Sequence, residues 1–391
     1  MKIKIVSSFG LVSSLFFIIF SFLGRVLFPF GDEPDFTVRA PRVIFGEHPW
    51  WSPYSIFHDL LANLEVVSTC SIEASATSMW MSIGTNCTEN IEQIIVRFIL
   101  TILVAFPLLY AITMRKSFVT MMYFLNFKLS AKEWNYRLDA LSLSILIPSM
   151  IYYFGIFAEE QFTLVLSLFI FLFWGSWILT TFIFSLVMYI DLGNSIVLLT
   201  FILFGLFFTF ISKKINIKVS ITLMLSIVFI AFILGFSFLT YLENISLLAS
   251  KAEAMYNKGL GFENKYPVIL RPVVTYMTGV FMTPSGVKMI FLYLVYTPVL
   301  LWVFYKIHIY NKHVKSHEFQ NSYTLLLVVF TTILFFVFLF PDYAFAKYYV
   351  FMIPFLFVPL LGILKKNNIL KFLILSNLIV FLHLILYRIN F

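Results

Sequence analysis

Hydrophobic residues run along this chain in long blocks that show no polar face. Leu100–Ile112 and Leu325–Phe340 are apolar on every side, whereas a strand of a membrane β-barrel alternates apolar and polar residues over about ten positions. A helix needs roughly 20 apolar residues to cross the hydrocarbon core, where no water satisfies backbone N–H and C=O groups. The pattern predicts an all-α, polytopic integral membrane protein that forms a single transmembrane domain over residues 1–391.

Ten apolar blocks approach or exceed the length of a span. The block 162–190 is long for one helix and carries Trp174-Gly175-Ser176-Trp177 near its middle, so it forms either one long helix or a pair of short ones. We favour the broken pair because it gathers the cationic loops on one side, whereas one long helix would invert every segment after Ile190. The prediction is 10–11 transmembrane helices, near residues 5–28, 95–114, 139–157, 162–190, 195–212, 218–241, 287–305, 323–340, 349–364 and 369–387.

The distribution of charge predicts which side of the membrane each loop lies on. The chain carries 27 Lys and Arg against 19 Asp and Glu, and an excess of Lys and Arg marks cytoplasmic loops. Lys2 and Lys4 precede the first block, and no small-x-small cleavage site precedes the polar segment Gly31–Asp35, so we expect an uncleaved first span with the N-terminus on the cytoplasmic side. In this topology most cations lie inside and most acids outside. The partner that explains the positive charge is therefore the bilayer, and no nucleic-acid partner is predicted.

Two segments predicted on the outer, periplasmic face are longer than connectors, which is typical of loops that carry function. They are 29–94 and 242–286. In the first, Pro49-Trp50-Trp51-Ser52-Pro53-Tyr54 precedes apolar residues at helical spacing, which predicts an interfacial helix or, equally, a small globular loop. Cys70 and Cys87 lie in the same loop, where a disulfide is expected and two unreactive thiols are the alternative.

An acidic cluster opens the first loop. Gly31-Asp32-Glu33-Pro34-Asp35 places three carboxylates within four positions. Like charges this close raise one another's pKa, so such a cluster tends to bind a cation or to keep one member as an acid or base. A divalent cation at Asp32, Glu33 and Asp35 is therefore one possibility, and the alternative is a solvated turn formed around Gly31 and Pro34.

Cations in both outer loops and before a late span complement this cluster. Arginine offers a planar fork of donors that matches phosphate oxygens, and a carboxylate can deprotonate a hydroxyl. Together they suit a donor that bears phosphate and an acceptor that bears a hydroxyl group. Taken singly, each cation could instead anchor lipid head groups. The candidate substrate-binding residues are Asp35, Arg39, Arg42, His48, Arg271 and Lys347.

The layout resembles the GT-C superfamily of glycosyltransferases, which use polyprenyl-phosphate-linked sugars. The chain has an uncleaved first span, Asp32-Glu33 at the start of a long outer loop, and many later spans, and Asp342–Tyr349 running into Phe351-Met352-Ile353-Pro354 is similar to a pattern that opens a late span in that family. The resemblance is greatest to enzymes that modify O-antigen and related surface polysaccharides. It implies that Asp32 acts on the acceptor hydroxyl with Glu33 beside it, and that the acidic residue shares a metal in some members.

Two alternatives remain at this point. The chain also resembles the O-antigen repeat-unit polymerases in length, span number and its two large outer loops, and in that family Arg271 would hold a diphosphate leaving group. A transporter or lipid-linked sugar flippase would instead place ionisable residues near the middle of broken helices, where His383 is the clearest candidate.

Overall fold

The computed structural model describes most of the apolar blocks and little of the two long outer loops. The described residues are 6–27, 91–125, 127, 129–155, 159–212, 214–215, 217–235, 267–281, 298, 301–302, 305, 317–340 and 346–389. Every regular element among them is a helix, and these residues contain no strand. The predicted all-α class is confirmed for this part of the chain.

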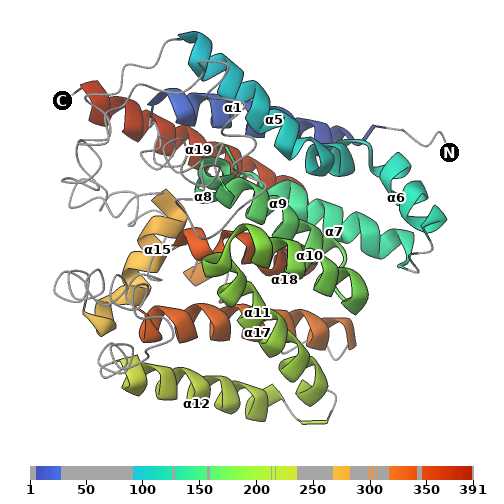
Figure 1. The fold of residues 1–391 in the computed structure, drawn as a ribbon, viewed down its shortest axis with the longest axis vertical. Coiled ribbons are helices and arrows are strands. Elements are labelled where there is room, and N and C mark those ends of the chain that lie inside the picture. The colour runs from blue at the N-terminus through green and yellow to red at the C-terminus, as the bar shows by residue number, and fades with distance from the viewer. Residues whose placement is uncertain are drawn as a thin grey trace, which may run out of the picture. The chain divides into compact units, whose positions relative to one another are not determined.

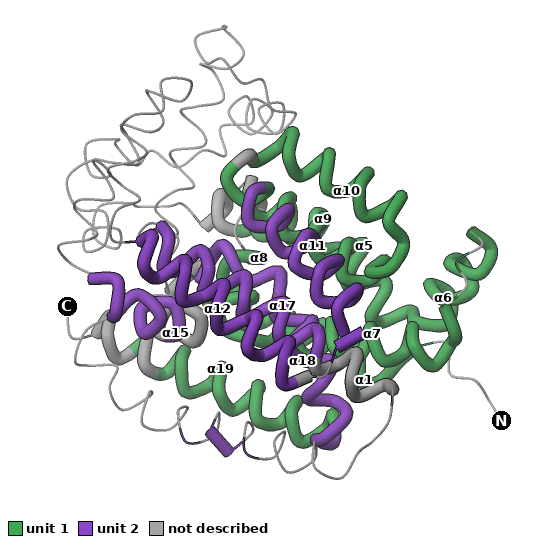
Figure 2. Tube along the Cα trace, turned by 90° about the horizontal axis from the view of Figure 1, so that it is seen from below, with its two compact units in different colours: residues 1–195, 366–391 green, residues 196–365 purple. Residues whose placement is uncertain are grey.

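The chain divides into two compact units (Figure 2), each of which is described by itself. Unit 1 comprises residues 1–195 and 366–391, so it joins the first and last helices of the chain. Its helices, labelled in Figure 1, are α1 (Ser8–Leu27), α5 (Ile91–Thr113), α6 (Arg115–Phe124), α7 (Ala131–Ser144), α8 (Pro148–Phe154), α9 (Glu159–Leu172), α10 (Trp177–Ile190) and α19 (Lys366–Ile389).

Unit 2 comprises residues 196–365. Helix α15 and the short η2 before it occupy part of the expected outer loop 242–286, so that loop is partly helical. The elements of unit 2 are α11 (Leu192–Ser212), whose first residues belong to unit 1, α12 (Ile217–Gly235), η2 (Val268–Leu270), α15 (Arg271–Phe281), α17 (His317–Leu339), η5 (Ala346–Met352) and α18 (Ile353–Ile363).

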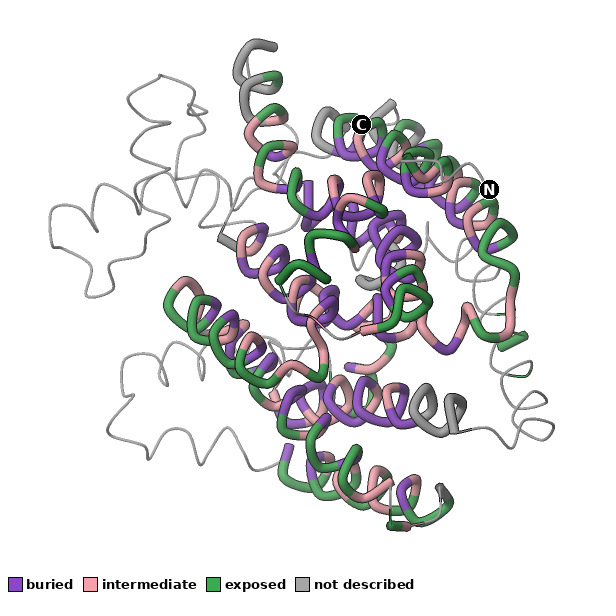
Figure 3. The backbone as a smooth tube through the Cα atoms, turned by 90° about the vertical axis from the view of Figure 1, so that its right-hand side faces the viewer, coloured by how far each residue is buried: buried purple, intermediate pink, exposed green. Residues whose placement is uncertain are grey.

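Several described helices have the composition of membrane spans. By length and hydropathy, three of the described helices could cross a bilayer, Gly193–Ser212, Lys218–Gly235 and Ala346–Ile363, and a fourth span is present if the bent pair Phe98–Thr113 and Arg115–Phe124 counts as one. Their outward sides are apolar, as are those of shorter helices, with Leu203, Phe229 and Ile178 exposed by 53%, 62% and 86%. Figure 3 shows helices that carry buried residues along one side and exposed residues along the other. A water-facing surface rarely presents so much apolar area, so these faces indicate a membrane protein.

The break predicted inside the block 162–190 is confirmed. Helix α9 ends at Leu172 and α10 begins at Trp177, and the two helices pack against each other. Gly175 lies between them with a φ of 99°, a conformation that costs glycine little and that other residues rarely adopt. The motif is a tight turn between two short helices.

A second block differs from its prediction. The segment 139–157 was expected to form one span, but α7 ends at Ser144 and α8 begins at Pro148. Proline has no N–H to donate to the preceding turn and disfavours a helical residue before it, and Ile147 is extended at φ −70° and ψ 134°. The expectation of one continuous helix was therefore wrong.

A close helix crossing in unit 1 joins α1 to α5. The Ser7 N–H donates to the Thr113 carbonyl at 2.9 Å, and a Cβ added to Gly10 would lie 1.8 Å from the Ile112 carbonyl oxygen. Lipid is as apolar as the side chains of a helix, so helices in a bilayer associate through close packing and hydrogen bonds rather than through the hydrophobic effect. Gly10 thus permits a backbone contact that any side chain would prevent.

We predict that Gly10→Ala destabilises the protein and that Gly24→Ala on the same helix does not. A Cβ at Gly24 would meet the ring of Phe381 at 3.5 Å, an ordinary contact, whereas a Cβ at Gly10 forces α1 away from α5, which costs about 1–3 kcal/mol or more. Thermal unfolding of the purified variants in one detergent measures the difference. Equal midpoints for the two variants would show that the crossing is not this close.

Candidate functional site

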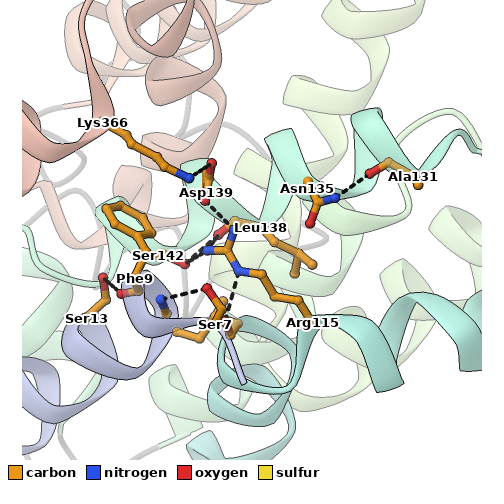
Figure 4. Close-up of polar contacts among 12 residues, drawn as sticks. Ser7, Phe9, Ser13, Arg115, Ala131, Asn135, Leu138, Asp139, Ser142 and Lys366 are labelled. Atoms are coloured by element: carbon orange, nitrogen blue, oxygen red, sulfur yellow. Dashed lines mark hydrogen bonds and ion pairs between the residues drawn. The ribbon is translucent and has the colours of Figure 1, made fainter. Parts of the chain in front are cut away.

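Three charged side chains from distant parts of the chain meet in unit 1. Asp139 of α7 accepts a hydrogen bond from Arg115 Nη1 through Oδ1 and one from Lys366 Nζ through Oδ2, the latter at 2.8 Å. Arg115 also donates from Nη2 to Ser142 Oγ at 2.9 Å. Figure 4 shows Asp139 between the two cations. We call Arg115, Asp139, Lys366 and Ser142 the charged cluster.

The bend between α5 and α6 brings Arg115 into this cluster. The two helices meet at 92°, and Met114 between them leaves helical geometry at φ −98° and ψ 47°. Arg115 Nε donates to the Ile112 carbonyl at 3.1 Å, at the end of α5. Carbonyls in the last turn of a helix have no partner within the helix and carry the negative end of its dipole, so the guanidinium satisfies this end while it pairs with Asp139.

The first helix joins the cluster through an aromatic ring. The Arg115 guanidinium lies 5.6 Å and the Lys366 ammonium 4.9 Å from the centre of the Phe9 ring, distances at which a cation is attracted to the ring face. Phe9 is the second residue of α1 and Lys366 the first of α19. The two helices therefore begin at the same end of unit 1.

The cluster differs in chemistry from a catalytic acid or base. Each oxygen of the Asp139 carboxylate accepts a hydrogen bond from a cation, so one negative charge faces two positive charges. Arg115 is 8% exposed as a residue, and the side chains of Asp139 and Lys366 are 13% and 44% exposed. A buried ion pair holds elements in one geometry, and removing one member leaves the other unbalanced. The arrangement suits a structural tie between α5, α7 and α19.

Another arginine caps a helix end near this cluster. Arg137 Nη1 donates to the carbonyls of Leu172 at 2.6 Å and Phe171 at 3.5 Å, at the end of α9. Arg137 precedes the expected span 139–157, and its partial burial lowers its pKa to about 10, so it stays charged at neutral pH.

The first turn of α7 has a cap of its own. The Ser130 hydroxyl accepts from the Glu133 N–H at 3.2 Å, while Glu133 Oε2 accepts from the Ser130 N–H at 2.9 Å. The hydrogen bonds from the Ser130 backbone and side chain lower the pKa of the Glu133 carboxyl. This reciprocal capping box fixes where α7 begins.

Amide side chains satisfy backbone groups at two other breaks in unit 1. Asn377 Nδ2 donates at 2.6 Å to the Leu146 carbonyl, which lies between α7 and α8. Gln161 Nε2 donates at 3.0 Å to the carbonyls of Phe154 and Thr101, so it joins the end of α8 to α5. Both amides are completely buried. They let the helices break without leaving these carbonyls unpaired in an apolar interior.

Arg271 is a buried cation of unit 2. It is the first residue of α15, is completely buried, and donates from Nη1 to the Phe338 carbonyl at 2.8 Å. Phe338 lies in the last turn of α17, and a Cβ added to Gly235 at the end of α12 would lie 2.2 Å from the same oxygen. The ends of α12 and α17 and the start of α15 thus meet at one carbonyl.

Lys347 lies on η5, which packs against α15, the helix that begins with Arg271. Helix α15 contacts both α17 and η5, and η5 carries Lys347. The Lys347 ammonium lies 5.2 Å from the centre of the Tyr348 ring. Two of the cations predicted to bind phosphate, which are far apart in the sequence, therefore belong to adjacent elements of unit 2.

The other predicted site residues lie outside the described residues, together with the two cysteines. They are Asp32, Glu33, Asp35, Arg39, Arg42, His48, Cys70 and Cys87. The side chain of His383 is also outside them. Within the described part of the chain, no three His, Cys, Asp or Glu side chains form a group that could hold a metal ion. The proposed cation site at the acidic cluster stays a prediction.

The sequence indicated Arg115, Asp139 and Lys366 only as charges that contribute to the orientation of the chain. Nothing near Asp139 in the sequence points to its partners, which are 24 and 227 positions away. Gln161 and Asn377 were not singled out, although an amide within an apolar run is a signal of a polar contact inside a membrane protein.

No family model, curated protein or solved structure matches this chain. What the protein does must therefore be inferred from its own residues and contacts.

We predict that Asp139→Asn destabilises the protein by about 3 kcal/mol, because it leaves the buried Arg115 charge unbalanced. Lys366→Gln removes the more exposed partner and should cost at most about 1 kcal/mol. Denaturant unfolding in mild detergent measures both values, and the double variant measures their coupling. A cost for Lys366→Gln equal to that of Asp139→Asn would contradict this ranking.

Proposed function

We propose that this chain is a multi-pass glycosyltransferase of a bacterial inner membrane. In this proposal it transfers a sugar from a polyprenyl-phosphate-linked donor to a surface polysaccharide of O-antigen type on the periplasmic face. The observation that carries the proposal is the buried Arg271 at the start of α15. Helix α15 packs against η5, which bears Lys347.

The direction of the helices supports an outer location for Arg271. Helix α12 begins next to the lysines of the segment 213–218 and ends at Gly235, beside the carbonyl that Arg271 contacts. Its 19 residues extend roughly 28 Å, close to the thickness of a hydrocarbon core. If the lysines mark the inner face, Arg271 belongs to the outer one.

The ends at which helices begin and finish also limit how many times the chain can cross the membrane. Helices α1 and α19 begin at the same end of unit 1. If both helices span the membrane, the chain from the start of α1 to the start of α19 must cross it an even number of times. Helices α12 and α17 both end at the Phe338 carbonyl, so their ends lie on the same side of the membrane. The chain between the end of α12 and the start of α17 must then cross the membrane an odd number of times. The eleven-segment topology, with α9 and α10 as separate segments, fulfils both conditions.

Transfer of a sugar from a lipid phosphate needs charges of both signs. The sugar passes through an oxocarbenium-like state while the phosphate departs, so cations must stabilise the leaving group and a base must accept the proton of the incoming hydroxyl. Arg271 and Lys347 suit the first task, because arginine offers a fork to phosphate and lysine a point charge. Asp32 with Glu33 beside it suits the second.

The transport alternative has less support from the described residues. A transporter would be expected to place ionisable groups at broken helices near the middle of the membrane. Between α7 and α8, and at the end of α8, the side chains that contact the backbone are the amides of Asn377 and Gln161. The charged side chains of Arg115 and Arg137 contact the ends of α5 and α9, which the distribution of charge predicts to lie at the inner face and not in the middle of the membrane.

We predict that Asp32→Asn abolishes, and Glu33→Gln weakens, the modification of surface polysaccharide by cells that express this chain. The neutral amide cannot accept the proton of the acceptor hydroxyl. The measurement is the polysaccharide banding pattern, with each variant's amount checked by immunoblot. Single repeat units in the variant would indicate a polymerase, and full-length chains of altered serotype would indicate a decorating transferase. An unchanged pattern in both variants would remove the acidic site from the proposal.

We predict that Arg271→Lys weakens transfer but keeps the free energy of unfolding within about 1 kcal/mol of that of the wild type, since a cation remains beside the Phe338 carbonyl. Lysine cannot present two parallel donors to a phosphate, so transfer should fall by tenfold or more. Lys347→Gln should weaken transfer, whereas Lys218→Gln, at the opposite end of α12, should not. Full transfer by Arg271→Lys would leave Arg271 as a helix cap alone.

A further inference from the structure

Helix α6 runs across the direction of the helix before it. Helix α5 has 23 residues, and its last 20, from Ile94 on, contain one charged residue, Arg97, and extend about 30 Å, the thickness of a hydrocarbon core. After it the chain turns by 92° into α6, seen at the N-terminal end of unit 1 in Figure 1. A helix at a right angle to a spanning helix lies parallel to the membrane plane. Because α5 is long enough by itself, α6 is not needed to complete the span.

One side of α6 is fixed to the protein. Arg115, Phe118 and Met122 are buried, and the Phe118 ring packs edge-on against Trp134 of α7 at 5.6 Å. The charged cluster holds the first residue of α6 in place. The direction of α6 is therefore set by contacts along its length.

The end of α6 presents large apolar side chains outward. Met121, Tyr123, Phe124 and Leu125 are exposed by 44%, 47%, 90% and 55%. Aromatic residues such as Tyr123 favour the boundary between acyl chains and head groups, where the ring is in an apolar layer and the hydroxyl meets water. Water alone is a poor environment for a patch of this composition.

The charge at this end of unit 1 is positive. Lys116, Lys132 and Lys366 are exposed there, while Asp139 is balanced by two cations and Glu133 is the exposed acid. Lysines near a bilayer surface are attracted by anionic head groups. An anionic leaflet therefore complements the apolar patch and the lysines at once, and an in-plane helix with these two features is typical of interfacial binding.

We propose that α6 is an interfacial helix that binds the anionic phospholipids of the leaflet at the end of unit 1 where α1 begins. Tyr123 and Phe124 enter the acyl boundary, and Lys116 contacts head groups. This surface is distinct from the proposed glycosyl-transfer site. It rests on the membrane placement proposed above and not on the enzymatic activity.

The depth of position 124 tests the proposal. A nitroxide is attached to Phe124→Cys in the full chain with Cys70→Ser and Cys87→Ser, reconstituted in phosphatidylcholine with or without one third phosphatidylglycerol. Accessibility to oxygen and to a water-soluble nickel complex reports depth. Ile19→Cys, exposed at 51% near the middle of α1, is the control for the hydrocarbon core. Ala131→Cys, exposed at the start of α7, is the control for water.

We expect position 124 to lie between the two controls and to move deeper when phosphatidylglycerol is present. Lys116→Gln should lower the affinity of α6 for phosphatidylglycerol relative to phosphatidylcholine about fivefold, so position 124 should move less when phosphatidylglycerol is added. Lys218→Gln should leave this movement unchanged. Nickel accessibility equal to that of Ala131→Cys would show that α6 lies in water or contacts another protein. Depth equal to that of Ile19→Cys would show that α6 continues the span. If Ile19→Cys itself is not in lipid, the membrane placement fails, a result separate from the other two.

Discussion

The carbonyl groups at helix ends are the constraint on which the described structure depends. They have no partner within the helix, and where they are buried among other helices no water reaches them. Three arginines satisfy such ends: Arg115 donates to Ile112 at the end of α5, Arg137 to Leu172 at the end of α9, and Arg271 to Phe338 at the end of α17. A cation suits these positions because the C-terminal end of a helix carries the negative pole of its dipole.

Two of these capped carbonyls are also points of closest approach between helices. Gly10 of α1 contacts the carbonyl that Arg115 caps, and Gly235 of α12 contacts the carbonyl that Arg271 caps. Helices in lipid gain little from the hydrophobic effect on association, so contact at a small residue and a hydrogen bond at the same place supply much of what holds them together. A glycine admits the neighbouring backbone, and the arginine then completes the hydrogen bonding of the exposed carbonyl.

Much of the fold could be predicted from the sequence, because a span is a local property of about 20 residues and the turn at Gly175 needs only a local signal. The charged cluster could not. Asp139 pairs with Arg115, 24 positions away, and with Lys366, 227 positions away, and no local pattern encodes such partners. Pro148 could have marked the break after α7, but the apolar character of the whole block 139–157 favoured one helix. Of the predicted site, only Arg271 and Lys347 lie in described residues, and sequence alone did not indicate that Arg271 is buried at a helix start.

The capping contacts bear on why a full positive charge occupies position 271. Arg115 and Arg137 lie where the distribution of charge predicts the inner face, so orientation and capping favour the same residues. Arg271 lies in the segment proposed to be outside, where a cation opposes that orientation rule. Capping alone does not require the charge, since this chain caps other helix ends with the amides of Gln161 and Asn377. A buried charge also costs more to hold in place than an amide. In the proposed function, a phosphate ligand would supply the reason for this charge, because a guanidinium binds phosphate far more strongly than an amide does.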